Sequence, residues 1–315
     1  MSTHNVAVVA LGGNALLRAG ESATASGQAA RAKQAAHCIA ETIAAGFRVI
    51  VIHGNGPQVG NLLLQMESAA DRIPPSPLDE AVAATQGTMG YLLERALRNE
   101  LLSRGLNAEV TTLLTLVEVR PDDPAFSHPE KPVGPVLSAE RAQHLRVIEH
   151  ASVVEERGRG FRKTVPSPAP LALVEAGILR TLVEANYIVL AGGGGGIPVV
   201  REASGALAGI EAVIDKDRTA VLLARAVKAT HLIILTEVEL VYEAFGTAAQ
   251  KPISSANAAV MAEHLKRGEF PPGNMGPKIE AALTFLAEGG EEVLITSLEA
   301  LPQAMAGQTG TRIKP

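Results

Sequence analysis

Aromatic residues are rare in this chain, and tryptophan is absent. Of its 315 residues only 3% are aromatic, although 47% are hydrophobic. The core must therefore be built from Ala, Val, Leu and Ile, which suits helices packed on a buried, mostly parallel sheet. This length allows one large α/β domain or two smaller ones.

Cysteine, long apolar runs and excess positive charge are also missing. The single cysteine, Cys38, excludes an internal disulfide framework and fits a reducing compartment; in its Ala-rich surroundings we expect a small core residue. No run of about 18 apolar residues and no cleavable basic leader is visible, so we expect a cytoplasmic protein with no membrane partner. The net charge of −5 gives no general attraction to nucleic acid.

Several familiar nucleotide and hydrolase motifs do not occur. The absence of Gly-x-x-x-x-Gly-Lys-[Ser/Thr] excludes a P-loop NTPase, and the absence of Gly-x-Ser-x-Gly excludes an α/β-hydrolase. Gly54-x-Gly56-x-x-x-Gly60 is one residue too long for the dinucleotide fingerprint. The eight histidines show no metal-ligand spacing. His53 ends an apolar run beside Gly54, where it either meets a ligand or satisfies local backbone groups.

What the sequence does contain is a regular alternation of apolar runs and amphipathic segments. Such alternation predicts right-handed βαβ units around a mostly parallel central sheet. We expect the closing residues 307–313 to form a short hairpin or edge strand. The expected strands are 6–11, 49–52, 110–116, 187–191, 231–235 and 292–296, and the expected helices are 26–45, 59–68, 79–104, 171–185, 216–228, 255–267 and 278–289.

One segment interrupts this alternation. Residues 121 to about 166 are dense in Pro, Gly and charged side chains. A loop this long is unusual in a compact domain unless it has a function. We therefore expect a small subdomain that protrudes from the main sheet.

Three glycine-rich segments each follow an expected buried strand. They are Leu11-Gly12-Gly13-Asn14, His53-Gly54-Asn55-Gly56 and Gly192 to Gly196, which includes Gly193 and Gly194. A strand that ends in glycine lets backbone N–H groups approach a ligand with no Cβ in the way, and a following helix N-terminus favours an anion. Together they indicate a protein that holds phosphates or carboxylates.

Lysine is scarce, with nine against nineteen arginines, yet three lysines lie in Gly/Pro-rich or strand-end contexts. These are Lys131, Lys216 and Lys278. A lysine is a compact charge on a flexible stem, suited to following a phosphoryl group as it moves. Asp215 and Asp217 flank Lys216, where an aspartate either orients lysines from other segments or approaches a metal. A helix cap at Asp215 is an equally good interpretation and is compatible with those roles.

The combination of anion-binding turns, three lysines and no general base describes a reaction whose acceptor is already ionised. Phosphoryl transfer to a carboxylate oxygen needs no proton removal. Catalysis then consists of in-line positioning and neutralisation of charge on the transferred group. The sequence therefore indicates an acyl-phosphate kinase.

At this point the motifs resemble a known family. The chain is similar to carbamate kinases, within the amino acid kinase superfamily, along nearly its whole length. Two positions depart from the family pattern: Asn274 replaces a usual serine, and Phe161 stands where Trp or Tyr is common. The matching segments are 9–16, 53–60, Gln86-Gly87, Gly90-Tyr91, 131–135, 165–168, 193–199, 212–217 and 273–281.

The resemblance implies a single domain, an open three-layer αβα sandwich with the small protruding subdomain at 121–166. It implies an N-terminal lobe, 1–185, that holds carbamate, and a C-terminal lobe, 186–315, that holds the nucleotide. It further implies a homodimer and reversible phosphoryl transfer between MgATP and carbamate to give ADP and carbamoyl phosphate, with Mg²⁺ held mainly by the nucleotide phosphates and no metal ligand from the chain.

The resemblance also implies roles for individual residues. Lys131 would reach in from the subdomain, Lys216 and Lys278 would bracket the nucleotide phosphates, and Asp215 would keep the lysines in place. Carbamate and the migrating phosphoryl group would be held by Gly12, Gly13, Asn14, Gly54, Asn55, Gly193 and Gly194. The nucleotide side would include Thr236, Tyr242, Met275 and Gly276.

Two other functions are compatible with the same features. One is a different acyl-phosphate kinase of this superfamily, acting on an amino-acid carboxylate. The other is a nucleotide-binding regulator that has lost catalysis. The retention of Lys131, Lys216, Lys278 and Asp215 favours an active enzyme.

Overall fold

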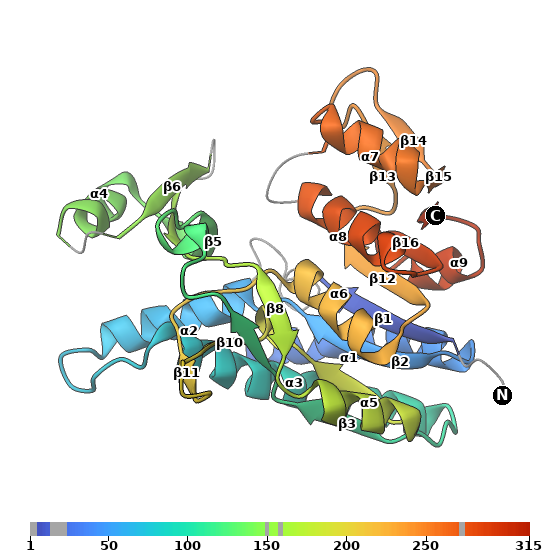
Figure 1. Cartoon of the computed structure of the whole chain (residues 1–315), viewed down its shortest axis with the longest axis horizontal. Coiled ribbons are helices and arrows are strands. Elements are labelled where there is room, and N and C mark those ends of the chain that lie inside the picture. Colours follow the sequence, from blue (N-terminus) through green and yellow to red (C-terminus); the bar gives the residue numbers. More distant parts are fainter. Residues whose placement is uncertain (1–4, 13–23, 149–150, 157–159, 271–274) are drawn as a thin grey trace.

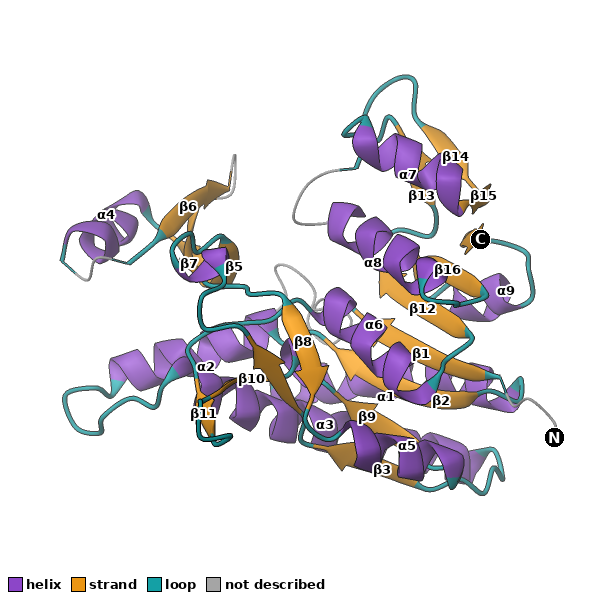
Figure 2. Ribbon diagram, viewed as in Figure 1, coloured by secondary structure: helices purple, strands orange, loops and turns teal. Residues whose placement is uncertain are grey.

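A computed structural model describes residues 5–12, 24–148, 151–156, 160–270 and 275–315. Its centre is an eight-stranded sheet (Figures 1 and 2) in which every neighbouring pair is parallel except β16 and β17. The α/β class with a mostly parallel sheet is thus confirmed. In spatial order the strands are β15 (Ser255–Asn257), β17 (Thr311–Lys314), β16 (Glu292–Ser297), β12 (His231–Thr236), β1 (Val6–Leu11), β2 (Arg48–His53), β9 (Ile188–Ala191) and β3 (Val110–Leu113).

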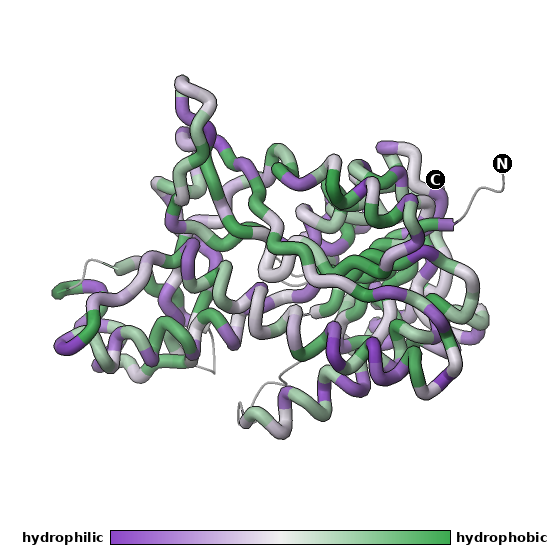
Figure 3. The backbone as a smooth tube through the Cα atoms, turned by 90° about the horizontal axis from the view of Figure 1, so that it is seen from below, coloured by the Kyte–Doolittle hydropathy of each residue, from purple (hydrophilic) through white to green (hydrophobic). Residues whose placement is uncertain are grey.

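Helices cover both faces of this sheet. On β1, Val8 and Ala10 face one apolar cluster, whereas Ala7 and Val9 face the other, as strand alternation requires. The first cluster includes α5 (Ala176–Glu184), α6 (Lys216–Val227) and α8 (Met275–Ala287). The second includes α1 (Ala25–Ala44), α3 (Leu78–Ser103) and α9 (Leu301–Met305). Figure 3 shows the hydrophobic stretches gathered along the central strands.

Smaller elements surround this sandwich. A four-stranded sheet contains, in order, β11 (Leu207–Gly209), β10 (Ile197–Arg201), β4 (Leu116–Val119) and β8 (Pro170–Leu173). Strands β13 (Val241–Glu243) and β14 (Lys251–Ile253) pair with each other near α7 (Ala258–Lys266). Within the described residues, no helix combines the length and apolar character needed to cross a membrane.

A separate three-stranded sheet projects from the body of the molecule (Figure 1). It has the order β5 (Lys131–Leu137), β7 (Gly160–Val165) and β6 (Val153–Glu156), and it carries α4 (Ala139–Val147). A 3-10 turn, η2 (Pro124–Phe126), precedes it. We call this sheet with α4 the arm. Its base packs on α2 (Gly56–Ser68).

Three expected boundaries and the expected place of one strand in the sheet were wrong. The strand expected at 110–116 is two strands in different sheets, because Thr115 turns the chain between them and its hydroxyl donates to the Leu113 carbonyl. The helices expected from 171 and 255 begin only at Ala176 and Ala258, since the preceding residues pair as β8 and β15. The closing strand β17 is not at the edge, because β15 covers it.

Candidate active site

A cavity of about 180 Å³ lies where several of these elements meet. Strand β2 delivers Gly54 and Asn55 to it, the turn after β9 delivers Gly194, and the arm delivers Lys131. In parallel α/β sheets, ligands bind at the carboxyl ends of strands in this way. The remaining lining residues are Gly56, Pro132, Val133, Val213, Ile214, Asp215, Lys216, Asp217, Pro277 and Lys278.

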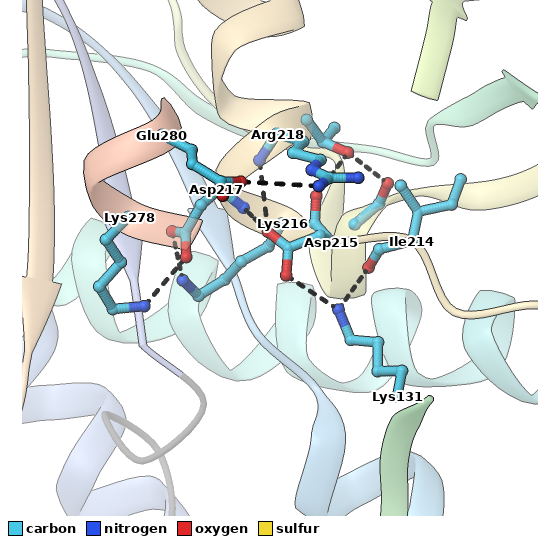
Figure 4. A network of polar contacts seen from close by, with 10 residues as sticks. Lys131, Ile214, Asp215, Lys216, Asp217, Arg218, Lys278 and Glu280 are labelled. Atoms are coloured by element: carbon cyan, nitrogen blue, oxygen red, sulfur yellow. Dashed lines mark hydrogen bonds and ion pairs between the residues drawn. The ribbon is translucent and has the colours of Figure 1, made fainter. Parts of the chain in front are cut away.

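Lys131 reaches from the arm to the start of α6 (Figure 4). Its Nζ lies 3.1 Å from Asp215 Oδ2 and donates to the Ile214 carbonyl oxygen, also at 3.1 Å. The other Asp215 oxygen, Oδ1, accepts from the backbone N–H of Asp217 at 2.9 Å and caps α6. The expected helix cap and the expected lysine contact therefore occur in one carboxylate.

The other two lysines are held by Asp217 rather than by Asp215. Lys216 Nζ donates to Asp217 Oδ1 at 2.6 Å, and Lys278 Nζ donates to Oδ2 at 2.9 Å. The Asp217 side chain is only 4% exposed, so this bridge between α6 and α8 is shielded from water. The sequence drew attention to Asp217 as a neighbour of Lys216 able to orient lysines, but the site residues assigned from the sequence included only Asp215 of the two aspartates.

Burial and charge shift the pKa values of this cluster in opposite ways. Burial alone would raise the pKa of Asp215, but Lys131 and Lys216 outweigh it and hold that pKa below its usual range. Burial likewise opposes ionisation of Asp217, and Lys216 and Lys278 keep its pKa low. Burial lowers the pKa of Lys216, whereas for Lys278 the Asp217 charge outweighs burial and raises the pKa.

The charges around the cavity favour an anion. Three ammonium groups, on Lys131, Lys216 and Lys278, face two carboxylates, on Asp215 and Asp217. With every group ionised, one positive charge is left over at this cavity. A phosphate placed there would meet donors already held in position, the arrangement that stabilises charge in a transition state.

The glycine turn after β9 is packed tightly against β2 and its continuation. Gly192, Gly194, Gly195 and Gly196 all have positive φ values, which glycine adopts without strain. A Cβ added at Gly193 would lie 2.4 Å from His53 Nε2, and one at Gly194 would lie 2.2 Å from Asn55 Nδ2. Glycine is required here for space as well as for backbone conformation.

Side chains from α3 and α6 fix this turn. Gln86 Nε2 donates to the Gly193 carbonyl at 2.9 Å, and Gln86 Oε1 accepts from the Thr115 N–H at 3.0 Å. The Thr219 hydroxyl donates to the Gly195 carbonyl at 2.7 Å. Gln86 was noted only as part of a motif, and its buried amide now has a structural explanation. Thr219 gave no signal in the sequence.

The His53 ring packs against Gly193 of this turn, and the imidazole is neutral at neutral pH. Burial lowers its pKa to about 4, although the hydrogen bond between Nδ1 and the Gly54 carbonyl opposes that shift. It does not line the cavity. Its geometry is that of a packing residue satisfied by local backbone, the second of the two roles open to it from the sequence.

Some expected site residues are not among those that line this cavity. Gly12 donates its N–H to the Leu235 carbonyl at 3.0 Å, next to the end of β12 where Thr236 lies. Tyr242 is on β13, its ring 6.0 Å from that of Phe245. Met275 and Gly276 open α8 just before Lys278. Gly13, Asn14 and Asn274 are outside the described residues.

Two further expectations concern cysteine and metal chemistry. Cys38 is buried in the α1 side of the core, as expected, and burial raises its pKa to about 11, which keeps the thiol protonated. Among the residues that the structure places, no group of three or more His, Cys, Asp or Glu side chains is arranged to hold a metal ion.

Comparison with known proteins identifies the family. The model of the amino acid kinase family matches residues 5–297, and the chain belongs to this family. Among its relatives, a carbamate kinase of Pyrococcus horikoshii is 43% identical over 310 residues, 98% of each chain. Carbamate kinase 2 of Enterococcus faecalis is 46% identical over 296 residues, 93% of this chain and 94% of the relative.

The fold agrees with the same group of kinases. The structure of carbamate kinase from Giardia lamblia bound to AMP-PNP superposes with a TM-score of 0.91 at 37% identity, covering 100% of this chain and 99% of the other. The resemblance to carbamate kinases drawn from the motifs is therefore confirmed. Membership places the chain among kinases, enzymes that transfer phosphoryl groups.

Proposed function

We propose that this chain is a carbamate kinase, which transfers a phosphoryl group reversibly between ATP and carbamate. The observation that carries this proposal is the convergence of Lys131, Lys216 and Lys278 on one cavity beside Gly54 and Gly194. Its relatives named as carbamate kinases support the choice of acceptor.

The chemistry needs no general base from the chain. In the direction of ATP formation, an oxygen of the ADP β-phosphate attacks phosphorus of carbamoyl phosphate. The P–O bond to carbamate breaks, and carbamate leaves as an anion. The nucleophile is already ionised, so no proton is exchanged with a side chain. The lysines then act by holding reactants in line and by neutralising charge on the transferred group.

The positions of the elements support the following residue roles. Gly54, Asn55 and Gly194 present backbone and amide groups to carbamate and the moving phosphoryl group, with Gly193 shaping the turn. Lys131 approaches from the arm, while Lys216 and Lys278 bracket the nucleotide phosphates from α6 and α8. We assign Gly12, Gly13 and Asn14 to the same phosphoryl site.

Magnesium enters this scheme with the nucleotide. Mg²⁺ prefers oxygen ligands and commonly binds through substrate phosphates and water. The two carboxylates of the cavity, Asp215 and Asp217, are already engaged by lysines, so the residues fit a metal carried by ATP or ADP rather than one held by the chain. We assign the adenine side to Thr236, Tyr242, Met275 and Gly276.

We also propose a homodimer and net flux toward ATP. Exposed apolar side chains near the β3 edge of the sheet, Tyr91 and Leu114 among them, are compatible with a subunit contact. Carbamoyl phosphate is an acyl phosphate, so its conversion to ATP is downhill. Light scattering of the purified protein tests the dimer: a monomer mass at micromolar concentration would contradict it.

The reaction itself is tested by ATP formation. The purified protein is mixed with ADP, Mg²⁺ and carbamoyl phosphate, and acetyl phosphate serves as the comparison donor. Fast ATP synthesis with carbamoyl phosphate and slow synthesis with acetyl phosphate is the expected result. ADP binding without ATP synthesis from carbamoyl phosphate would refute the proposal.

A further inference from the structure

The arm touches the body of the molecule through two glycines. A Cβ added at Gly60 on α2 would lie 2.1 Å from Gly134 Cα and 2.5 Å from Gly134 N on β5. Gly134 has a φ of +77°, which favours glycine, whereas Gly60 lies within a helix where alanine is intrinsically better. Helical preference therefore does not explain Gly60, but the close approach of the arm does.

We call the contact of α2 with β5 around Gly60 and Gly134 the seam, and other side chains stabilise it. Val133, next to Gly134, is 2% exposed and packs in an apolar cluster with Val59 of α2 and with Val82 of α3. Within the arm, Arg162 on β7 donates from Nε to the Gly134 carbonyl at 3.1 Å and so ties Gly134 to the neighbouring strand. The seam fixes how deeply β5 sits against α2.

Lys131 is three residues before Gly134 on the same strand. Its register is set by pairing with Val165, while Pro132 pairs with Thr164 and Val133 with Lys163. Pro132 and Val133 line the cavity together with Lys131. The register of β5 and β7 shifts after Val133, so Gly134 itself lies where the regular pairing is interrupted. A displacement of Gly134 therefore reaches Lys131 through three consecutive residues of the chain, and the Lys131 ammonium group now meets Asp215 Oδ2 at 3.1 Å.

We propose that Gly60 is a positioning residue that sets how far Lys131 enters the cavity. The inference rests on the proposed function, because it treats Lys131 as a group that contacts the transferred phosphoryl. Gly60 itself touches no reactant; it acts by leaving room for Gly134. Restoring an ordinary contact of 3.4 Å from 2.1 Å requires β5 and α2 to separate by about 1.3 Å at this point. Misplacement on the scale of 1 Å costs catalysis about 10²-fold.

The test compares Gly60→Ala with Gly177→Ala. Both replace a helical glycine by alanine, but a Cβ at Gly177 on α5 meets nothing within 4 Å. Gly60→Ala should lower kcat for ATP formation by about 10²-fold. Its Kd for ADP should stay within a factor of about two, because Lys216 and Lys278 are on other elements. Gly177→Ala should change neither, and an unchanged kcat in Gly60→Ala would overturn the inference.

A double-mutant cycle tests whether the effect passes through Lys131. If it does, Gly60→Ala combined with Lys131→Ala should be no slower than Lys131→Ala alone. If the fold-decreases in kcat of the two single variants multiply in the double variant, Gly60 acts by another route and the proposal is refuted. A general loss of structure would instead lower ADP affinity in every variant that contains Gly60→Ala.

A measurement independent of activity separates this inference from the proposed function. Acylation of Lys131 by an amine-reactive reagent, followed by mass spectrometry, should be faster in Gly60→Ala than in the wild-type protein, with Lys278 unchanged as the internal reference. Equal Lys131 labelling would overturn the inference even if the wild-type protein made no ATP from carbamoyl phosphate.

A second variant covers the case in which Gly60→Ala does not fold. Val133→Ala loosens the same seam from the arm and leaves α2 intact. It should increase Lys131 labelling and lower kcat while ADP binding is kept. If labelling and kcat both match the wild-type protein, the seam does not position Lys131.

Discussion

Lys278 on α8 and Asp217 on α6 are 61 positions apart in sequence, yet Nζ of one donates to Oδ2 of the other at 2.9 Å. Lys216 Nζ donates to the other oxygen of the same carboxylate, Oδ1, at 2.6 Å. One buried negative charge thus holds two positive charges at the wall of a cavity. Without it, two ammonium groups would lie close together and lack the carboxylate that now bridges them.

Asp217→Asn should lower turnover and move its pH dependence. The amide keeps the shape but removes the charge that favours protonated lysine, so the pKa of Lys216, already lowered by burial, should fall further. As the pH rises, Lys216 then loses its proton at a lower pH than it does in the wild-type enzyme. We expect kcat to fall about tenfold or more at pH 8 and to recover partly at pH 6, measured as ATP formation across pH.

The exposed pair between the same two helices provides the control. Arg218 on α6 and Glu280 on α8 approach to 3.6 Å, with both side chains about half exposed. Exposed pairs contribute about 0–1 kcal/mol, so Glu280→Gln should leave kcat and its pH profile unchanged. Identical profiles for Asp217→Asn and the wild-type enzyme would show that the lysines do not depend on this carboxylate.

Lys131→Ala and Lys278→Ala should each reduce kcat by about 10²-fold or more, the usual cost of removing one contact to transition-state charge. Lys163→Ala is the matched control, because Lys163 is also on the arm but points toward Glu67 at 3.8 Å. It should retain wild-type kcat. Near-normal turnover in either of the first two variants would remove that lysine from the mechanism.

The sequence predicted the parts of the site that are local and missed those that depend on packing. Lys131, Lys216 and Lys278 were recognisable because glycine, proline or a strand end flanks each one. Which lysine each aspartate binds could not be predicted, because Asp215 and Asp217 both flank Lys216. Only the packing of α8 against α6 decides that Asp217 is the one that meets Lys278.

In the fold, too, local sequence patterns predicted the long elements but not the short ones that depend on tertiary pairing. Long periodic segments such as α1 and α3 were predicted to within one or two residues. Strands β8 and β15 were taken for helix because each is only three or four residues long and is stabilised by a partner distant in sequence. Tertiary pairing, not local preference, decides such short segments.

Gly194→Ala should cost more stability than Gly205→Ala. Both glycines have positive φ, +70° and +87°, so the backbone strain of about 1–2 kcal/mol is shared. Only Gly194 meets a neighbour, the Asn55 amide at 2.2 Å, and overpacking of this kind adds about 1–3 kcal/mol. Urea unfolding measures the difference. Equal losses in the two variants would show that the turn can relax away from Asn55.

His53 should make the protein lose stability as the pH falls. The folded chain binds a proton on His53 only near pH 4, whereas the unfolded chain binds it below about 6.5, so unfolding takes up a proton in this window. A pKa lowered from 6.5 to about 4 corresponds to about 3 kcal/mol, present above pH 6.5 and lost as the pH falls toward 4. Urea midpoints of wild-type protein and His53→Gln at pH 7 and pH 4.5 test this.

The two proteins should differ in how much stability they lose between these pH values, not only in how stable they are at pH 7. His53→Gln gives up packing against Gly193 and should be less stable at neutral pH, but its loss on acidification should be smaller by about 2 kcal/mol. Parallel losses in wild-type protein and His53→Gln would mean that His53 titrates with an ordinary pKa, and the neutral packing role assigned to it would be wrong.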